Sequence, residues 1–239
     1  MTHRTLLFLF LLAPAVMGSE ANRLEPILAQ PGEVFLKMNF EEDFTVGADH
    51  LNFRAINGTR WAAKDGVLIG TESSAEFQAE KKAAGDGHNG TNAQLQVKGS
   101  PRDFIFKYSF KITGGRKAKG SPMVESGHHL RYIHFGAEGT SILTGRDKKV
   151  IAQSDFVLKL DQWYHVMIEV KGGEFLVRFQ DGPTVYGRDP SIAADCPTKY
   201  DIRFTATDKG VITIDNMTIW HAGDTMGSWP AAREAVLKK

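Results

Sequence analysis

Cysteine is almost absent from this chain of 239 residues, in which Cys196 is the only one. A single cysteine excludes a disulfide within the chain, and it excludes a zinc site built on several thiolates. The fold must therefore be held together by its hydrophobic core. Hydrophobic residues make up 42% of the chain and charged residues 24%, which is typical of a globular protein.

A charge excess of one sign is also missing. The chain has 29 Lys and Arg against 28 Asp and Glu, so its net charge is +1. Proteins that bind nucleic acid or an anionic membrane usually carry a strong basic field, so neither partner is expected here. No apolar run approaches the ~20 residues that a membrane-spanning helix needs. We expect a soluble monomer.

The first residues read as a targeting segment. His3 and Arg4 precede an apolar run from Leu6 to Val16, and small residues follow it. This order is typical of a secretory signal peptide. We therefore predict a signal over 1–21, cleaved after Gly18 or after Ala21, and a protein that is secreted or periplasmic. No cysteine follows the run, so a bacterial lipid anchor is not expected.

The rest of the chain alternates hydrophobic and polar residues with a period of two, which is the pattern of half-buried strands. In the segment 103–112 this period places Phe104, Phe106, Tyr108, Phe110 and Ile112 on one face. Segments 163–170 and 174–179 repeat the pattern around Gly172-Gly173 and form a predicted hairpin. Short strands with many turns predict an all-β fold, a two-sheet antiparallel sandwich over 34–221.

Two further expectations concern the C-terminal third. The segments 199–207 and 211–220 flank Asp208-Lys209-Gly210, which predicts a second hairpin. Helix is expected only at 229–237, where Pro230 and good helix formers follow Ser228. We assign 22–33 as an extended linker and 222–239 as a tail containing this helix.

Four segments together resemble a known layout: "WAAKDGVLIG" (61–70), "DFIFKYSFKITGG" (103–115), "LDQWYHVMIEVKGGEFLVRFQDG" (160–182) and "VITIDNMTIW" (211–220). The chain resembles the concanavalin-type, laminin-G-like jelly rolls of exported bacterial proteins, and among them the 3-keto-disaccharide hydrolase domains. Near the strand after the glycine-rich loop, Ser126, Gly127 and Arg131 match that family, whereas Glu125 and the histidines depart from it. The resemblance implies a jelly roll whose outward concave sheet face holds a carbohydrate ligand.

Strand parity selects the candidate site residues. If the aromatic rows face inward, the residues that alternate with them face outward. Counting Leu130 as an inward residue also places its neighbours His129 and Arg131 on the outward face. We expect these side chains to converge on one outward face. The predicted catalytic residues are His129, His165 and Glu169, and the predicted ligand-binding residues are Lys107, Arg131, Arg178 and Glu125. A histidine would transfer the proton and an arginine would hold sugar oxygens.

Several other sites receive little support from the sequence. His129 and His165 on neighbouring strands could meet one ion, but hydrogen-bonding roles are the simpler interpretation, so we predict no metal site. No cofactor is expected. Calcium is the one alternative, through the loop carboxylates Asp86, Asp208 or Asp215. The Glu-x-Asp-x-x-Glu spacing of jelly-roll glucanases does not occur.

Two functions therefore stay open. In the first, the chain is an exported domain that binds or acts on carbohydrate, as a hydrolase of 3-keto-glycosides. In the alternative, it is a non-catalytic laminin-G-like module that binds a protein or a cell-surface partner. A polar cleft would favour the first function, and a large apolar patch on the concave sheet would favour the second.

Overall fold

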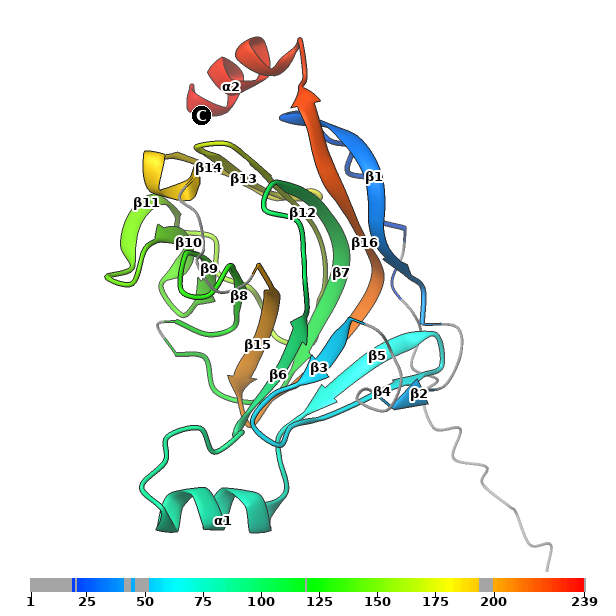
Figure 1. The fold of residues 1–239 in the computed structure, drawn as a ribbon, viewed down its shortest axis with the longest axis vertical. Coiled ribbons are helices and arrows are strands. Elements are labelled where there is room, and N and C mark those ends of the chain that lie inside the picture. The colour runs from blue at the N-terminus through cyan, green and yellow to red at the C-terminus, as the bar shows by residue number, and fades with distance from the viewer. Residues whose placement is uncertain are drawn as a thin grey trace, which may run out of the picture.

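The structure is a computed structural model that describes residues 19, 21–40, 44–45, 52–118, 120–193 and 200–238. The predicted signal segment up to Gly18 and Cys196 lie outside the described residues. Within them the fold is all-β, with two antiparallel sheets packed face to face (Figure 1). This confirms the sandwich that the sequence predicts.

One sheet has nine strands, in the order β14-β13-β12-β7-β16-β5-β4-β2, with β1 also paired to β16. These strands are β1 (Ala29–Met38), β2 (Phe44–Thr45), β4 (Arg60–Lys64), β5 (Val67–Thr71), β7 (Phe104–Thr113), β12 (Trp163–Lys171), β13 (Glu174–Phe179), β14 (Thr184–Arg188) and β16 (Val211–Thr225). We call it the nine-stranded sheet. Its long strands are visibly bent in Figure 1.

The other sheet has seven strands, in the order β11-β10-β9-β8-β15-β6-β3. These strands are β3 (Phe53–Ala55), β6 (Asn92–Val97), β8 (Met123–Ser126), β9 (Arg131–Gly136), β10 (Gly139–Thr144), β11 (Lys149–Ser154) and β15 (Ile202–Asp208). A short 3-10 turn, η1 (Pro190–Ala193), lies in the connection between β14 and β15. We call this the seven-stranded sheet.

The core lies between the sheets, and the predicted aromatic row of β7 is part of it. Phe106 and Tyr108 stack with ring centroids 4.4 Å apart, and both rings meet Phe204 of the opposite sheet edge-on. The inward rows of β12 and β13 are also buried in this cluster, as predicted. The β12–β13 hairpin is confirmed as well.

The second predicted hairpin is wrong. β15 pairs with β6 and β8, whereas β16 pairs with β7, β5 and β1, so the turn at 208–210 carries the chain from one sheet to the other. Inward residues of the two strands, such as Phe204 and Ile214, belong to the same core from opposite sides. A sharp turn therefore joins the two strands without pairing them.

Two helices flank the sandwich in the part of the chain that the structure describes. The predicted C-terminal helix is confirmed as α2 (Trp229–Leu237) and lies at one end of the molecule (Figure 1). Helix α1 (Ala75–Ala83) projects from the other end and was not predicted from the sequence. Ser74 caps it by accepting a hydrogen bond from the Phe77 amide, but it has no buried residue and so lacks a hydrophobic stripe that would reveal it.

The segment expected as a linker is part of the fold. β1 already begins at Ala29, and residues 22–28 lie against the outer face of the nine-stranded sheet. A second hydrophobic cluster forms there, away from the main core. Its buried members are Leu28, Ala29, Ile105, Met167, Leu176 and Trp229.

Candidate functional site

The outer face of the seven-stranded sheet carries a row of polar side chains from five neighbouring strands. Cross-strand register aligns Arg54 with Gln96, Gln96 with Arg203, Arg203 with Glu125, and Glu125 with Tyr132. Alternation explains their direction, because the strand neighbours of these residues fill the core. Those neighbours are Phe53, Leu95, Phe204, Val124 and Ile133. We call the five aligned residues the polar row.

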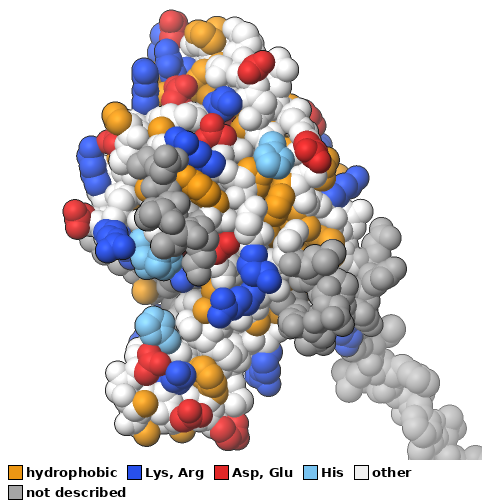
Figure 2. Space-filling model, viewed as in Figure 1, with side chains coloured by type: hydrophobic (Ala, Val, Ile, Leu, Met, Phe, Trp, Pro, Cys, Tyr) orange, Lys and Arg blue, Asp and Glu red, His pale blue; other side chains and the backbone are white. Residues whose placement is uncertain are grey.

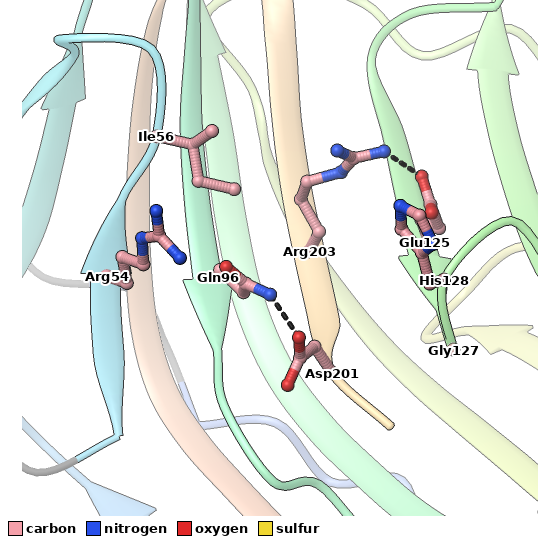
Figure 3. Close-up of a pocket in the computed structure, with 8 residues that line it drawn as sticks. All are labelled: Arg54, Ile56, Gln96, Glu125, Gly127, His128, Asp201 and Arg203. Carbon is pink, nitrogen blue, oxygen red and sulfur yellow. Dashed lines mark hydrogen bonds and ion pairs between the residues drawn. The ribbon is translucent and has the colours of Figure 1, made fainter. Parts of the chain in front are cut away.

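The polar row spans about 19 Å, at the usual spacing of about 4.8 Å between neighbouring strands. A hollow of about 170 Å³ opens over its β3 side. This first hollow is shown in Figure 3 and is lined by Arg54, Ile56, Gln96, Glu125, Gly127, His128, Asp201 and Arg203. The side chains in this view come from adjacent strands and leave several donors and acceptors at one surface.

Two carboxylates in the first hollow are held by neighbours. The Gln96 amide donates a hydrogen bond to Asp201, and the Gly99 amide donates to the other carboxylate oxygen at 3.0 Å. Glu125 is only 3% exposed, and it forms an ion pair with Arg203 (Figure 3). These contacts fix the direction of the side chains before any ligand arrives, which lowers the entropic cost of binding.

A second hollow, of about 540 Å³, continues the face toward β9 and the β10–β11 turn. Its lining residues are Met123, Glu125, His128, His129, Tyr132, Arg146, Lys148 and Arg203. Glu125, His128 and Arg203 line both hollows, so the two are continuous along the polar row. The face viewed in Figure 2 mixes basic, acidic, histidine and scattered hydrophobic side chains.

His129, Tyr132 and Glu125 form a hydrogen-bonded group in the second hollow. Nδ1 of His129 lies 3.0 Å from the Tyr132 hydroxyl and 3.6 Å from Oε1 of Glu125, and the His129 amide donates to the same oxygen at 2.9 Å. Burial lowers the pKa of His129, although the Glu125 carboxylate opposes this shift. Burial and Glu125 raise the pKa of Tyr132 to about 12. At neutral pH this group therefore contains a neutral imidazole and a protonated phenol.

The predicted convergence of six residues on one outward face, with Glu125 near the same cleft, is wrong. Glu125, His129 and Arg131 belong to the seven-stranded sheet or its β8–β9 turn, whereas Lys107, His165, Glu169 and Arg178 belong to the nine-stranded sheet. The structure brings Glu125 and His129 together and separates them from the other group. Catalytic and ligand-binding roles for these residues stay predictions.

Arg131 does not face outward as predicted. It shares its parity with the core residues Ile133 and Phe135, and it is fully buried. Its guanidinium donates to the carbonyl groups of Ile192 at 3.0 Å and Arg102 at 2.6 Å. The prediction failed because His129 adopts a left-handed conformation (φ 62°) in the turn before β9, which breaks the alternation counted from Leu130.

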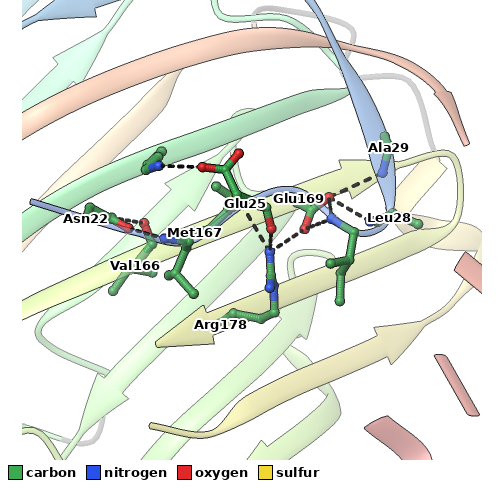
Figure 4. Close-up of polar contacts among 11 residues, drawn as sticks. Asn22, Glu25, Leu28, Ala29, Val166, Met167, Glu169 and Arg178 are labelled. Carbon is green, nitrogen blue, oxygen red and sulfur yellow. Dashed lines mark hydrogen bonds and ion pairs between the residues drawn. The ribbon is translucent and has the colours of Figure 1, made fainter. Parts of the chain in front are cut away.

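Glu169 and Arg178 do point outward, but the N-terminal segment covers them (Figure 4). The Glu169 carboxylate accepts hydrogen bonds from the backbone amides of Ile27, Leu28 and Ala29 at 2.8–3.2 Å. Arg178 donates to Glu169 at 3.3 Å and to the Glu25 carbonyl. In this structure both side chains attach the N-terminal segment to the sheet.

His165 lies in a cross-strand row with Ser109 and Asp215. Its Nδ1 is 2.8 Å from the Ser109 hydroxyl, but Ser109 occupies the middle of the row. A catalytic triad needs the histidine in the middle, so that the carboxylate orients it. Asp215 instead accepts hydrogen bonds from the amide and hydroxyl of Ser19, both at 2.9 Å. The row thus contains the three residue types of a catalytic triad, but the serine and not the histidine lies between the other two.

Lys107 lines a separate hollow of about 420 Å³ on the nine-stranded sheet, and its ammonium lies 3.6 Å from Glu25. Trp220, Asn216 and Thr218 line the same hollow. This hollow lies on the face that the N-terminal segment crosses, because Ala21 and Asn22 form part of its wall. None of the described residues of the N-terminal segment lines the two hollows along the polar row, so we take the polar row as the candidate site.

The sequence analysis missed Arg54, Gln96, Asp201, Arg203 and Tyr132. A signal was available for three of them, because Gln96, Arg203 and Arg54 each stand beside a buried residue in a short alternating segment. The sequence did not indicate that β15 pairs with β6 and β8. That pairing brings these strands into one sheet and aligns their polar residues.

The described part of the chain contains no group of three His, Cys, Asp or Glu residues placed to hold a metal ion. The carboxylates considered for calcium lie in different contacts. Asp86 pairs with Lys81, and Asp208 pairs with Arg116. The described residues also include no helix that is both long and apolar enough to cross a membrane.

Comparison with known proteins extends the description of the fold. No protein-family model matches the chain, and no curated protein matches it. A solved structure of a protein of unknown function with a galectin-like fold from Bacillus subtilis is similar, with a TM-score of 0.53 and 11% identity, over 82% of this chain and 99% of that chain. SCLam, a non-specific endo-beta-1,3(4)-glucanase from family GH16, is similar with a TM-score of 0.52 and 9% identity, over 85% of this chain and 100% of that chain.

At such low identity these likenesses define the fold alone. The chain is an all-β jelly-roll sandwich of the galectin-like, concanavalin-like type, as the sequence predicts. The likeness covers 82% of this chain for the first structure and 85% for the second.

Proposed function

We propose that the polar row and its two hollows bind a carbohydrate. The observation that carries this proposal is the alignment of five hydrogen-bonding side chains across neighbouring strands, from Arg54 to Tyr132. Guanidinium, amide and carboxylate groups placed side by side can each donate to or accept from neighbouring sugar hydroxyls. The jelly-roll fold, which the chain shares with an endo-beta-1,3(4)-glucanase, supports the same proposal.

The polar lining favours sugar over the alternative, a non-catalytic laminin-G-like module that binds a protein. Ile56 and Met123 are the aliphatic side chains among the described residues that line the two hollows. These hollows therefore lack the contiguous apolar surface that a protein-binding face usually has. Tyr132 is only 2% exposed, so hydrogen bonds rather than stacking on this ring would hold the sugar.

Within this proposal, His129 is the candidate proton-transfer group. It is neutral at neutral pH, it lines the second hollow, and it lies within reach of both Glu125 and Tyr132. The finer form of the proposal is hydrolysis of a 3-keto-glycoside, which the sequence resemblance implies. A glucanase mechanism with Glu-x-Asp-x-x-Glu is not proposed, because that spacing is missing from the sequence.

A glycan-array screen, followed by calorimetry on each hit, tests binding. We expect Arg54→Ala and Gln96→Ala to weaken binding at least about tenfold, because each removes a charged or amide hydrogen-bond donor. Arg23→Ala is the matched control, because Arg23 lies on the opposite face in an exposed ion pair with Asp181. If no glycan binds, or if the control variant weakens binding as much, the proposal fails.

Incubation with 3-keto-glucosides tests catalysis separately. Product release by the wild type that is lost in His129→Gln, with glycan binding retained, would support the hydrolase form. Binding without product release would leave a carbohydrate-binding domain and would exclude hydrolysis of these substrates.

A further inference from the structure

The second hollow carries more positive than negative charge. Arg146, Lys148 and Arg203 line it, and Glu125 is the only carboxylate among the described residues that line it. Arg203 already forms an ion pair with Glu125, so this pair is neutral as a unit. The excess charge of the hollow therefore comes from Arg146 and Lys148.

These two cations have no acidic partner among the described residues. No ion pair joins either of them to a carboxylate, and both side chains are exposed on the β10–β11 turn at the edge of the hollow. Lys148 lies over the Tyr132 ring, with its ammonium 5.2 Å from the ring centroid. This contact holds the ammonium beside the polar row, where a ligand would lie.

The basic side chains of the second hollow also affect the pKa values of two nearby histidines. Arg203 and Arg146 contribute to lowering the pKa of His129, and Lys148 contributes to lowering the pKa of His134, in each case after the larger effect of burial. Arg146 and Lys148 therefore lie close enough to these imidazoles to disfavour their protonated forms. The second hollow is therefore a place where an added negative charge is favourable.

We propose that the second hollow binds an anionic substituent, a carboxylate or a sulfate, on the sugar held along the polar row. This inference rests on the proposed carbohydrate function and names its ligand class, an acidic saccharide. The Arg146 guanidinium can donate hydrogen bonds to two oxygens of such a group at once, and Lys148 adds a second positive charge from the same turn. The first hollow, where Gln96 and Asp201 are joined, then takes a neutral part of the ligand.

The test compares four probes by calorimetry at low salt: a galacturonic acid oligomer, its methyl ester, a sulfated galactose oligomer and a neutral galactose oligomer. We expect an acidic probe to bind at least about tenfold more tightly than its neutral counterpart, which is the effect of one charge-assisted hydrogen bond. Raising the salt concentration should remove most of this preference. The uronate and sulfate arms identify which anion the hollow takes.

The double variant Arg146→Gln/Lys148→Gln should abolish the preference, so that acidic and neutral oligomers bind it with equal affinity. Lys149→Gln is the matched control, because Lys149 is the next residue, is exposed and pairs with Asp189 outside the hollow. Both variants should keep the circular dichroism spectrum of the wild type.

Three other outcomes would contradict the inference, the assignment of its residues or the proposed function. Equal binding of acidic and neutral probes overturns the acidic-saccharide inference and leaves the proposed function standing. A preference that survives in the double variant overturns the assignment to Arg146 and Lys148. If neither these probes nor any glycan on the array binds, the proposed function itself fails.

Discussion

Glu169 and Arg178 form an ion pair beneath the N-terminal segment, with 3.3 Å between Oε1 and the guanidinium. Glu169 is fully buried, and three consecutive backbone amides of the segment point at its carboxylate. A buried carboxylate is tolerated only when hydrogen bonds and an opposite charge replace its water. The pair therefore holds residues 25–29 against the nine-stranded sheet.

Glu169→Gln tests this attachment. The amide keeps the shape of the side chain but removes the charge that faces Arg178, so we expect the free energy of unfolding in urea to fall by about 3–5 kcal/mol. Lys107→Gln is the control, because its ion pair with the exposed Glu25 should contribute at most about 1 kcal/mol. Similar values for the two variants would show that the carboxylate does not anchor the segment.

Helix α2 should depend on Trp229 and not on Leu237. The Trp229 indole is 2% exposed, donates to Glu174 at 3.2 Å and packs edge-on against Tyr186. Trp229→Ala should lower the free energy of unfolding by about 3–5 kcal/mol. Leu237→Ala should change it by less than about 0.5 kcal/mol, because Leu237 is 65% exposed. Equal effects in thermal unfolding would contradict this description of how α2 docks.

Acid should destabilise the protein through His134. Burial lowers its pKa from 6.5 to about 4, with Lys148 adding to the shift and Glu125 opposing it. Between these pH values the unfolded chain binds more protons than the folded one, so stability is complete above pH 6.5 and falls as the pH drops toward 4. The loss can reach about 3 kcal/mol.

Urea unfolding at pH 7 and at pH 4.5 measures this loss. His134→Gln should show a smaller difference between the two pH values than the wild type. An NMR titration should leave the His134 ring signal unchanged until the pH falls below about 5. A ring that titrates near 6.5, or an equal pH dependence in the variant, would rule out the effect.

The two expected signal cleavage sites make different mature proteins. Cleavage after Gly18 leaves Ser19 at the amino terminus, with its nitrogen 2.9 Å from the Asp215 carboxylate. Cleavage after Ala21 would remove Ser19 and these hydrogen bonds. A free ammonium at Ser19 would give the largely buried Asp215 an opposite charge. We therefore predict cleavage after Gly18, which would leave Ser19 as the first residue.

Mass spectrometry of the processed chain decides between the two sites, and a chain beginning at Asn22 would contradict the expectation. In the protein that begins at Ser19, Asp215→Asn should lower the free energy of unfolding by about 1.5–3 kcal/mol, as for other hydrogen bonds to charged groups. Asp224→Asn is the control, because Asp224 is exposed near the end of β16. It should leave stability nearly unchanged.

The sequence predicted the sandwich well because its central strands carry regular aromatic rows. Phe104, Phe106 and Tyr108 repeat at a period of two that no helix could bury on one face. The inward rows of β12 and β13 are equally regular, and the structure places them in the core. The alternation of inward and outward side chains can be predicted reliably where a strand is long and uninterrupted.

The candidate site was harder to predict because it depends on which strands pair. The turn at 208–210 has the sequence of a hairpin, yet β15 and β16 lie in different sheets. Only this crossover places Arg203 between Gln96 and Glu125. Left-handed His129 then reverses the parity expected for Arg131. Turn chemistry fixes the local bend, but the destination of the next strand is decided by long-range packing.

The attachment of the N-terminal segment has a consequence for the order of assembly. Residues 22–29 leave the ribosome early, yet the groups they bind, from Val166 to Glu169, follow about 140 residues later. Contacts so distant in sequence form slowly, because a long loop must close first. This segment is therefore among the last parts of the fold to settle, although it is made well before the strand that binds it.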